Sequence, residues 1–273
     1  MIKDKSFFAE KSREIRRLTV ECIGDLGVGH LGGCLSVIDV LTVLYYSVMN
    51  VDPKNPCREG RDRLVLSKGH AGPALYSILA DKGFFPKEEL FTLNRAGTNL
   101  PSHCDMLRTP GVDMTTGALG QGFSCAVGIA IGSKIKKDNA TVYAVIGDGE
   151  SQEGQIWEAA MYAAHRRLDN LIACTDYNKL QIDGPTEEIN TLGDLGAKWA
   201  SFGWFVQRVD GHDHLAILTA IERAKTNSDG RPSMIILDTV KGKGVSFIEE
   251  AGANNHNMPI TSEQVQIALK ELS

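Results

Sequence analysis

The 273-residue sequence lacks the features that mark several large classes of protein. It has no block rich in Lys and Arg, and its formal net charge is −5, which argues against nucleic acid as the main partner. No apolar run approaches the ~20 residues needed to cross a bilayer. The charged N-terminal segment, residues 1–8, does not read as a signal peptide. We therefore expect a cytoplasmic protein that uses neither a membrane nor nucleic acid.

The six cysteines form no pattern of known chemistry. None of them belongs to a Cys-x-x-Cys pair, so the sequence supports neither a zinc site nor a redox site. We expect buried free thiols, which is the usual state of scattered cysteines. Cys104 is left open because it lies beside His103 in the sequence.

Short apolar runs alternate with amphipathic segments along most of the chain. Two of the runs are apolar throughout, which is typical of parallel strands buried on both faces. The predicted strands are 63–67, 141–146, 170–175, 205–209 and 234–238, and the predicted helices are 6–26, 36–48 with Ser36 as N-cap, a helix after His70 that ends near Gly83, 157–167, and 214–226 with Asp213 as N-cap. This alternation predicts an α/β fold, with a doubly wound, mainly parallel sheet and helices on both faces. We expect residues 1–273 to form one domain with an N-terminal helical extension.

Polar residues follow two neighbouring strands of the predicted sheet. Asp148 follows one buried strand in a Gly-Asp-Gly motif, and Asn178 follows the next strand along the chain. Either motif alone would be an ordinary turn. Adjacent parallel strands end at the same edge, however, so the two side chains are expected side by side, where such sheets bind ligands. Asp148, Asn178 and the backbone carbonyl of Leu180 suit Mg²⁺, or Ca²⁺ or Mn²⁺ in its place, with phosphate oxygens completing the shell. Gly149 would let the backbone approach a diphosphate.

Five motifs together resemble the transketolase family, and they occur in the family's order. The motifs are GHLGG at 29–33, SKGH at 67–70, TPGVDMTTGALGQG at 109–122, GDGESQEG at 147–154 and NKLQIDG at 178–184. The resemblance covers nearly the whole chain, from about residue 10 to about residue 260. It implies the thiamine-diphosphate-binding fold, with thiamine diphosphate and Mg²⁺ as cofactors. The implied activity is that of a transketolase (glycolaldehyde transferase), which moves a two-carbon ketol group from a ketose, or its phosphate, to an aldose, or its phosphate.

The same resemblance implies roles for individual residues. His70 and His256 would contact the diphosphate, and His30, His103 and His256 would bind sugar hydroxyls or exchange protons with them. The remaining cofactor-binding positions would be Gly117, Leu119, Gly147, Asp148, Gly149, Glu150 and Asn178. Three histidines have unusual neighbours: proline does not follow His30, proline and glutamate do not follow His103, and glycine does not follow His256. The other histidines, His165, His212 and His214, are interpreted as structural.

Two further carboxylates, Glu153 and Glu158, resemble those that connect the two active sites of a transketolase dimer. In that family the glutamate that activates the cofactor comes from a second, pyrimidine-binding domain on another subunit, which is not recognisable in this sequence. We therefore expect a split enzyme in which this chain is the N-terminal subunit. Its partner would be a C-terminal transketolase subunit. The natural assembly is a heterotetramer in which two copies of this chain associate with each other and with two partner chains.

Three other interpretations stay open. Residues 27–32 match the dinucleotide pattern G-x-G-x-x-G, although that motif should follow a strand and open a helix. Another thiamine-diphosphate enzyme, such as the α subunit of a 2-oxo acid dehydrogenase, would carry a similar cofactor half. A non-catalytic binding or regulatory remnant of the family is the third possibility.

Overall fold

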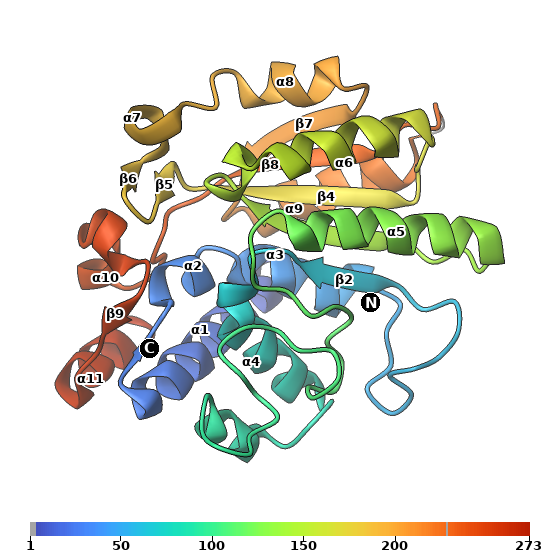
Figure 1. The fold of residues 1–273 in the computed structure, drawn as a ribbon. Coiled ribbons are helices and arrows are strands. Elements are labelled where there is room, and N and C mark those ends of the chain that lie inside the picture. The colour runs from blue at the N-terminus through green and yellow to red at the C-terminus, as the bar shows by residue number, and fades with distance from the viewer. Residues whose placement is uncertain (1–3, 228) are drawn as a thin grey trace.

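A five-stranded parallel sheet forms the centre of the computed structural model, which describes residues 4–227 and 229–273. The strand order is β2-β3-β4-β8-β7, and each neighbouring pair is parallel (Figure 1). The bounds are β2 Arg63–Leu66, β3 Val142–Gly147, β4 Leu171–Tyr177, β7 Phe205–Asp210 and β8 Ser233–Asp238. All five strands lie where the sequence predicts them. Residues 1–3 of the segment expected not to be a signal peptide lie outside the described residues.

Helices and short strand pairs surround this sheet. The helices are α1 Lys5–Leu26, α2 Leu31–Leu35, α3 Ile38–Val43, α4 Gly72–Lys82, α5 Gln121–Lys136, α6 Gly154–His165, α7 Thr186–Asn190, α8 Leu195–Ser201, α9 His214–Lys225, α10 Ser246–Glu250 and α11 Ser262–Glu271. Two antiparallel pairs stand apart from the main sheet: β1 Val28–Gly29 with β9 Met258–Pro259, and β5 Leu180–Gln181 with β6 Gly184–Pro185.

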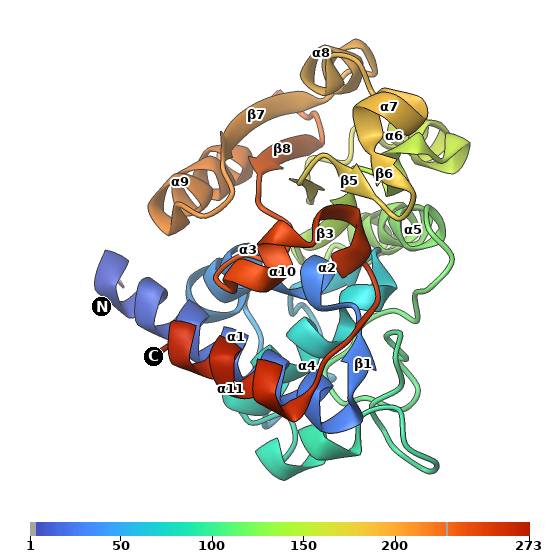
Figure 2. The same cartoon turned by 90° about the vertical axis from the view of Figure 1, so that its left-hand side faces the viewer.

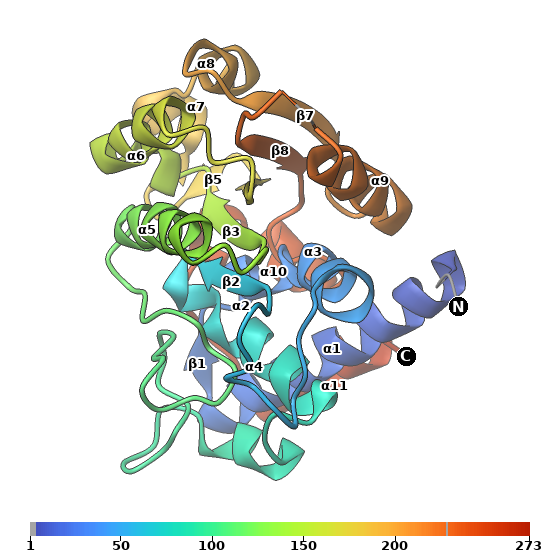
Figure 3. The same ribbon diagram turned by 90° about the vertical axis from the view of Figure 1, so that its right-hand side faces the viewer.

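Alternate side chains of each strand fill two separate cores. Leu64 and Leu66 of β2 pack in a core shared with α1 to α4, α9 and α11. Val65 points to the opposite face and packs in a core shared with α5, α6 and α8. The two helical layers are seen on either side of the sheet in Figures 2 and 3. The predicted doubly wound sheet, with helices on both faces, is confirmed.

Helix α1 begins and ends at the residues that its local chemistry favours. The Asp4 carboxylate accepts a hydrogen bond from the backbone N–H of Phe7 at 2.9 Å, and so caps the first turn. Gly27 ends the helix with φ +83°, a left-handed conformation that glycine adopts without steric cost. Phe8 and Ile23 are fully buried on the inner face, which holds α1 against the rest of the fold.

The helix predicted for residues 36–48 is confirmed from residue 38 on, because α3 continues without a break into a π-helical turn at Leu44–Val48. The predicted N-cap is wrong. Ser36 follows α2 instead, and its hydroxyl donates a hydrogen bond to Oδ2 of Asp176 at 2.7 Å. The Ser36 hydroxyl therefore bonds a residue distant in the sequence instead of capping the helix, as the local pattern predicts.

The cysteine prediction is correct for four residues and wrong for two. Cys22, Cys34, Cys104 and Cys174 are buried free thiols, whereas Cys57 is exposed and Cys125 is partly exposed. Cys57 lies in the 52–62 loop, most of whose residues are exposed or partly exposed. Among residues 4–227 and 229–273, no helix is long and apolar enough to cross a membrane.

Candidate functional site

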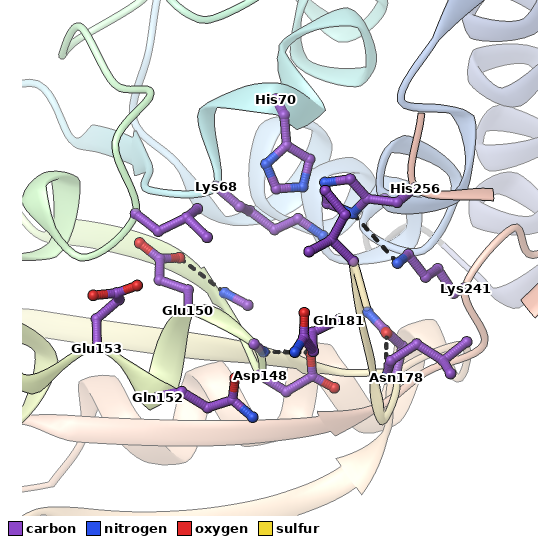
Figure 4. A pocket seen from close by; sticks show the side chains of 16 residues that line it. Lys68, His70, Asp148, Glu150, Gln152, Glu153, Asn178, Gln181, Lys241 and His256 are labelled. Atoms are coloured by element: carbon purple, nitrogen blue, oxygen red, sulfur yellow. Dashed lines mark hydrogen bonds between the residues drawn. The ribbon is translucent and has the colours of Figure 1, made fainter. Parts of the chain in front are cut away.

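A cavity of about 350 Å³ opens at the carboxyl ends of β2, β3 and β4. This is the edge at which sheets of this class bind ligands. Polar and charged side chains from five parts of the chain converge on the cavity (Figure 4). The polar lining residues are Lys68, His70, Asp148, Glu150, Gln152, Glu153, Asn178, Gln181, Lys241 and His256, and the others are Gly33, Leu119, Gly147, Gly149, Leu180 and Ile182.

Asp148 lies directly after β3 and is almost fully buried in the cavity wall. Its Oδ1 atom accepts a hydrogen bond from the Gly149 N–H at 2.7 Å, and its Oδ2 atom accepts one from the Lys179 N–H. Burial, and then repulsion from the nearby Asp176 carboxylate, raise the pKa of Asp148 to about 7. A buried carboxylate with a raised pKa gains from a bound cation, because the cation favours its charged form.

Gly149 has a local reason to be glycine. A Cβ atom at this position would lie 2.8 Å from Cβ of Gln181, so any larger residue would force the two loops apart. Gly33, on the other side of the cavity, leaves similar room. A Cβ there would lie 3.2 Å from Nε2 of His70. Both glycines let backbone approach the space that a ligand would fill.

Asp176, which sequence reasoning missed as a site residue, joins four segments behind the cavity. Its Oδ2 atom accepts hydrogen bonds from Ser36 Oγ, Lys68 Nζ and Asn178 Nδ2 at 2.7, 2.5 and 3.1 Å. Its Oδ1 atom accepts one from the hydroxyl of Thr239. Burial opposes ionisation of Asp176, but the Lys68 ammonium and these donors outweigh it and lower the pKa. The carboxylate thus fixes the orientation of groups that face the cavity.

Asn178 is one of those oriented groups. Because its amide nitrogen is held by Asp176, its Oδ1 atom is the end left for other partners, and it accepts the Leu180 N–H at 3.1 Å. Each amide or carboxylate oxygen has a second lone pair that a cation could use. Within the described part of the chain, no cluster of three or more His, Cys, Asp or Glu side chains is arranged to hold a metal ion. A cation held by the predicted donors Asp148, Asn178 and the Leu180 carbonyl would therefore need phosphate or water for its remaining ligands.

Two buried lysines line the cavity beside its carboxylates, and the sequence analysis did not single out either of them. Lys68 follows β2 within the motif at 67–70, and only 3% of its surface is exposed. Lys241 is 4% exposed and comes from the loop after β8. Burial, and then repulsion from the Lys68 ammonium, lower the pKa of Lys241 to about 8. Two buried ammonium groups beside each other suit a polyanion such as a diphosphate.

The structure brings all four predicted site histidines together. The His30 ring centroid lies 5.2 Å from that of His70, 5.8 Å from that of His103 and 5.4 Å from that of His256. The β1–β9 pair explains part of this arrangement, because His30 follows β1 and His256 precedes β9. His256, the site histidine with the least typical neighbours, is therefore placed at the cavity by a strand pairing between the two ends of the chain.

Burial and nearby positive charge favour the neutral form of His30, His70 and His256. Burial, and then the nearby His103 ring, lower the pKa of His30 to about 4. Burial, and then the Lys241 ammonium, lower that of His256 to about 4 as well. Burial and the Lys68 ammonium also hold the pKa of His70 well below its ordinary value. Neutral imidazoles can both donate and accept hydrogen bonds, which suits binding and proton exchange with hydroxyl groups.

Glu150 lines the cavity, but its carboxylate is already occupied by protein donors. It accepts hydrogen bonds from the Ser67 hydroxyl, from the Gly120 N–H at 2.8 Å and from the Gly147 N–H at 3.0 Å. Glu150 therefore links the three chain segments that contain these donors. Leu119, next to Gly120, lines the cavity as the sequence predicts.

The remaining predicted site residues lie at or beyond the rim. Gly117 faces the His103 ring, since a Cβ on it would lie 3.8 Å from Cδ2 of that ring. Glu153 is exposed and lines the cavity mouth. Glu158 is exposed on α6 and is not a lining residue of this cavity. Both glutamates are thus accessible to solvent.

The histidines interpreted as structural lie away from the cavity. His212 Nδ1 lies 2.7 Å from Asp39 Oδ2, and its Nε2 accepts the Val240 N–H at 2.9 Å. His214 is buried, with Nε2 3.0 Å from Asp39 Oδ1. His165 is exposed at the end of α6. These contacts agree with structural roles.

The dinucleotide-binding interpretation of residues 27–32 is wrong. The segment follows helix α1, and its two-residue strand β1 pairs with β9 rather than joining the main parallel sheet. A dinucleotide fingerprint requires the turn between a strand and a helix of one βαβ unit. That context is absent at residues 27–32.

Comparison with known proteins agrees with this geometry. The family model described as "Transketolase, thiamine diphosphate binding domain" matches residues 9–273. The 6-deoxy-6-sulfo-D-fructose transketolase subunit SqwG of a Clostridium species is 61% identical over 258 residues, which cover 94% of this chain and 93% of that protein. One subunit of the apulose-4-phosphate transketolase of Phocaeicola vulgatus is 41% identical, over 96% of this chain and 92% of that protein.

Solved structures of transketolases are similar to this chain over its whole length, but they are longer proteins. Transketolase from Campylobacter jejuni superposes with a TM-score of 0.92 at 31% sequence identity, over 99% of this chain but only 43% of that chain. The present chain thus spans about two fifths of a transketolase of that length, and nearly the full length of the separate subunits. The chain belongs to the transketolase family, of which it is the thiamine-diphosphate-binding domain and the counterpart of these separately encoded subunits.

Proposed function

We propose that this chain is the N-terminal subunit of a two-chain, thiamine-diphosphate-dependent transketolase. One observation carries the proposal: the chain covers 92–95% of relatives named as transketolase subunits, but about 41–43% of relatives named simply transketolase. The reaction would move a two-carbon ketol group from a ketose to an aldose. A C-terminal subunit with the pyrimidine-binding domain would complete the active site.

The cavity chemistry supports a diphosphate held with a divalent cation. Asp148, Asn178 and the Leu180 carbonyl would bind Mg²⁺, or Ca²⁺ or Mn²⁺ in its place, and Gly147 and Gly149 would allow close backbone approach. Lys68 and Lys241 would balance the charge of the phosphates, and the neutral His70 ring would donate a hydrogen bond to them. When bound, thiamine diphosphate would supply the nucleophilic carbon that a ketol transfer needs.

The residues near the mouth of the cavity would handle the sugar. His30, His103 and His256 would bind its hydroxyl groups and would take or return protons there. The low pKa values of His30 and His256 leave both rings neutral at neutral pH, so that a ring could accept a proton from a hydroxyl group and, once protonated, return it to the developing aldehyde oxygen. Leu119 and Gly117 would border the cofactor.

The assembly and its setting stay predictions. A heterotetramer of two copies of this chain and two partner chains would place the exposed Glu153 and Glu158 at a contact between subunits. Residues 1–273 would act as one diphosphate-binding domain, because α1 shares its core with α3, α4 and α11. A cytoplasmic location also remains a prediction.

The relatives suggest which ketose is the donor. The 61% identity with a 6-deoxy-6-sulfo-D-fructose transketolase subunit favours a sulfonated ketose as substrate. The 41% identity with an apulose-4-phosphate transketolase subunit makes a phosphorylated ketose the second candidate. Residues that bind the sulfonate or phosphate group of the donor are expected mainly in the partner chain. The complete enzyme is therefore needed to distinguish a sulfonated from a phosphorylated ketose.

The test is to tag this chain in its native host, purify it gently and identify what comes with it. We expect a near-stoichiometric second protein, and ketol transfer that depends on added thiamine diphosphate and Mg²⁺. Parallel assays with 6-deoxy-6-sulfo-D-fructose, apulose 4-phosphate and pyruvate would show the donor. A chain that comes out alone and inactive would contradict the two-subunit proposal and favour a non-catalytic remnant.

A further inference from the structure

Two of the cavity-lining groups come from one irregular segment, here named the strap and defined as residues 240–259. It follows β8 and contains α10, a 3₁₀ turn at Gly252–Asn255 and β9. Lys241 lies near its beginning and His256 near its end. Figure 4 shows the two side chains next to each other, with Lys241 Nζ 3.4 Å from His256 Nδ1. Fifteen residues of chain must therefore return to nearly the same point.

Asn255 closes this loop from inside. Its side chain is completely buried, and its Nδ2 atom donates hydrogen bonds to the carbonyl of Lys241 at 3.2 Å and the carbonyl of Ile248 at 2.8 Å. One amide group therefore joins the beginning, the middle and the end of the strap. Both cavity-facing groups are fixed by it: Lys241 through its own carbonyl, and His256 as the next residue in the chain.

Gly32 of α2 provides the slot in which Asn255 fits. A Cβ atom on Gly32 would lie 2.1 Å from Oδ1 and 2.4 Å from Cγ of Asn255, so even alanine would collide with the amide. The Gly32 carbonyl also accepts the Gly242 N–H at 3.0 Å, directly after Lys241. The strap is thus docked on α2 by a pair of contacts that both involve Gly32.

The Asn255 side chain is chemically specific for this place. Its Oδ1 atom is buried and has no hydrogen-bond partner among the described residues, which carries a free-energy cost. An aliphatic side chain would avoid that cost but could not donate to two carbonyls. Serine has one donor, and aspartate would repel both carbonyl oxygens. Only a primary amide supplies both hydrogen bonds from one atom.

We propose that Asn255 is a positioning residue that holds Lys241 and His256 toward the diphosphate of the cofactor. This inference rests on the proposed function, because it assumes that the cavity binds that diphosphate. Asn255 does not line the cavity and would act only through the two groups that do.

A double-mutant cycle tests this role, with the full chain and with inorganic pyrophosphate plus Mg²⁺ as the probe. Isothermal calorimetry would give the pyrophosphate affinity of the wild type, Asn255→Ala, Lys241→Met and the double variant. We expect each single change to weaken binding about tenfold, and the double variant to be weakened clearly less than a hundredfold, because part of the effect of Asn255 passes through Lys241. A residue that only stabilised the fold would instead give additive effects, about a hundredfold in the double variant.

Matched variants separate positioning from unfolding. Asn254→Ala removes an exposed asparagine next to Asn255, and it should bind pyrophosphate as the wild type does. Gly32→Ala, which fills the slot, should reproduce the loss caused by Asn255→Ala. If Asn255→Ala does not fold, Asn255→Ser keeps one donor and should show a smaller loss with the same coupling to Lys241→Met.

Two results would overturn the inference, and they are distinguishable. If the wild type binds pyrophosphate but the effects of Asn255 and Lys241 are additive, the positioning role is wrong while the proposed cofactor site stands. If the wild type binds no pyrophosphate with Mg²⁺, both the proposed diphosphate site and the role of Asn255 are wrong.

Discussion

The cavity is built from two regions that hold their functional groups by different means. At the sheet edge, Asp148 and Asn178 follow adjacent strands whose backbones are paired along their length. In the strap, Lys241 and His256 sit on a mostly irregular segment that docks through Asn255, a few backbone contacts and the buried side chains of Val245 and Ile248. The sheet ladder fixes the first pair at low conformational cost, whereas the second pair depends on a small number of tertiary contacts.

This difference indicates how the two regions should respond to change. At the edge, the loss of one carboxylate removes a group that nothing else can replace, and the backbone around it stays in place. In the strap, substitutions far from the ligand can move Lys241, because its position is set at a distance. We therefore expect direct, large effects at the edge, and graded, coupled effects in the strap.

The largest expected effect is at Asp148. Asp148→Asn should weaken binding of pyrophosphate with Mg²⁺ on the order of a hundredfold, because it removes the only carboxylate in the proposed cation site. Calorimetry with and without Mg²⁺ measures this change. Asp229→Asn alters an exposed carboxylate paired with Arg231 and serves as the control. Equal Mg²⁺ dependence in wild type and Asp148→Asn would remove Asp148 from the cation site.

Asp176 is expected to give the second largest effect, on stability as well as binding. Asp176→Asn leaves Lys68 buried without its carboxylate, and breaking such a pair costs about 3 kcal/mol or more of the free energy of unfolding. Urea denaturation measures that loss. Asp238→Asn offers a matched exposed pair, with Arg208, that should cost less than about 1 kcal/mol. Similar losses in both variants would mean that the edge is less rigid than its hydrogen bonds indicate.

In the strap, a pH dependence sharpens the comparison. Lys241 is charged below its pKa of about 8 and neutral above it, so it attracts a polyanion only on the acidic side. The advantage of wild type over Lys241→Met in pyrophosphate affinity should therefore be full at pH 7 and should shrink as pH rises past about 8. Taking the ratio of the two proteins removes the titration of pyrophosphate itself. A ratio that stays constant from pH 7 to pH 10 would show that Lys241 does not act through its charge.

The smallest expected effect concerns the histidines. The pKa values of His30 and His256, about 4, lie below those of an unfolded chain, about 6.5. The unfolded state therefore binds more protons between these values, and the free energy of unfolding should fall as pH drops from about 6.5 toward 4. Ring NMR signals of the two histidines should not titrate between pH 8 and pH 5.5. A midpoint near 6.5 for either ring would contradict the burial seen here.

Sequence reasoning succeeded where chemistry and local pattern coincide. The strands, the end of α1 at Gly27 and the cap of α9 at Asp213 all follow from neighbouring residues. Asp148 and Asn178 could be paired because one βαβ unit links consecutive strand ends. The fold class, and this part of the candidate site, were therefore predictable.

The rest depends on contacts between distant residues. Ser36 looked like a helix cap, but its hydroxyl binds Asp176, 140 positions away. Asp176 carries no pattern of its own that distinguishes it from any residue at the end of a strand. Lys241 could have been suspected from the glycines at 242 and 244 after a strand, but only the return of the strap places it beside Lys68. The position of Lys241 therefore depends on tertiary contacts of the strap, which the local sequence does not show.

The central claim is that this chain holds the diphosphate but needs a second chain for catalysis. The most direct measurement is ketol transfer by the purified chain alone, at saturating thiamine diphosphate and Mg²⁺, with a ketose donor and an aldose acceptor. The account predicts binding of pyrophosphate with Mg²⁺ but no turnover until a fraction containing the partner is added. Efficient ketol transfer by the chain alone would contradict it.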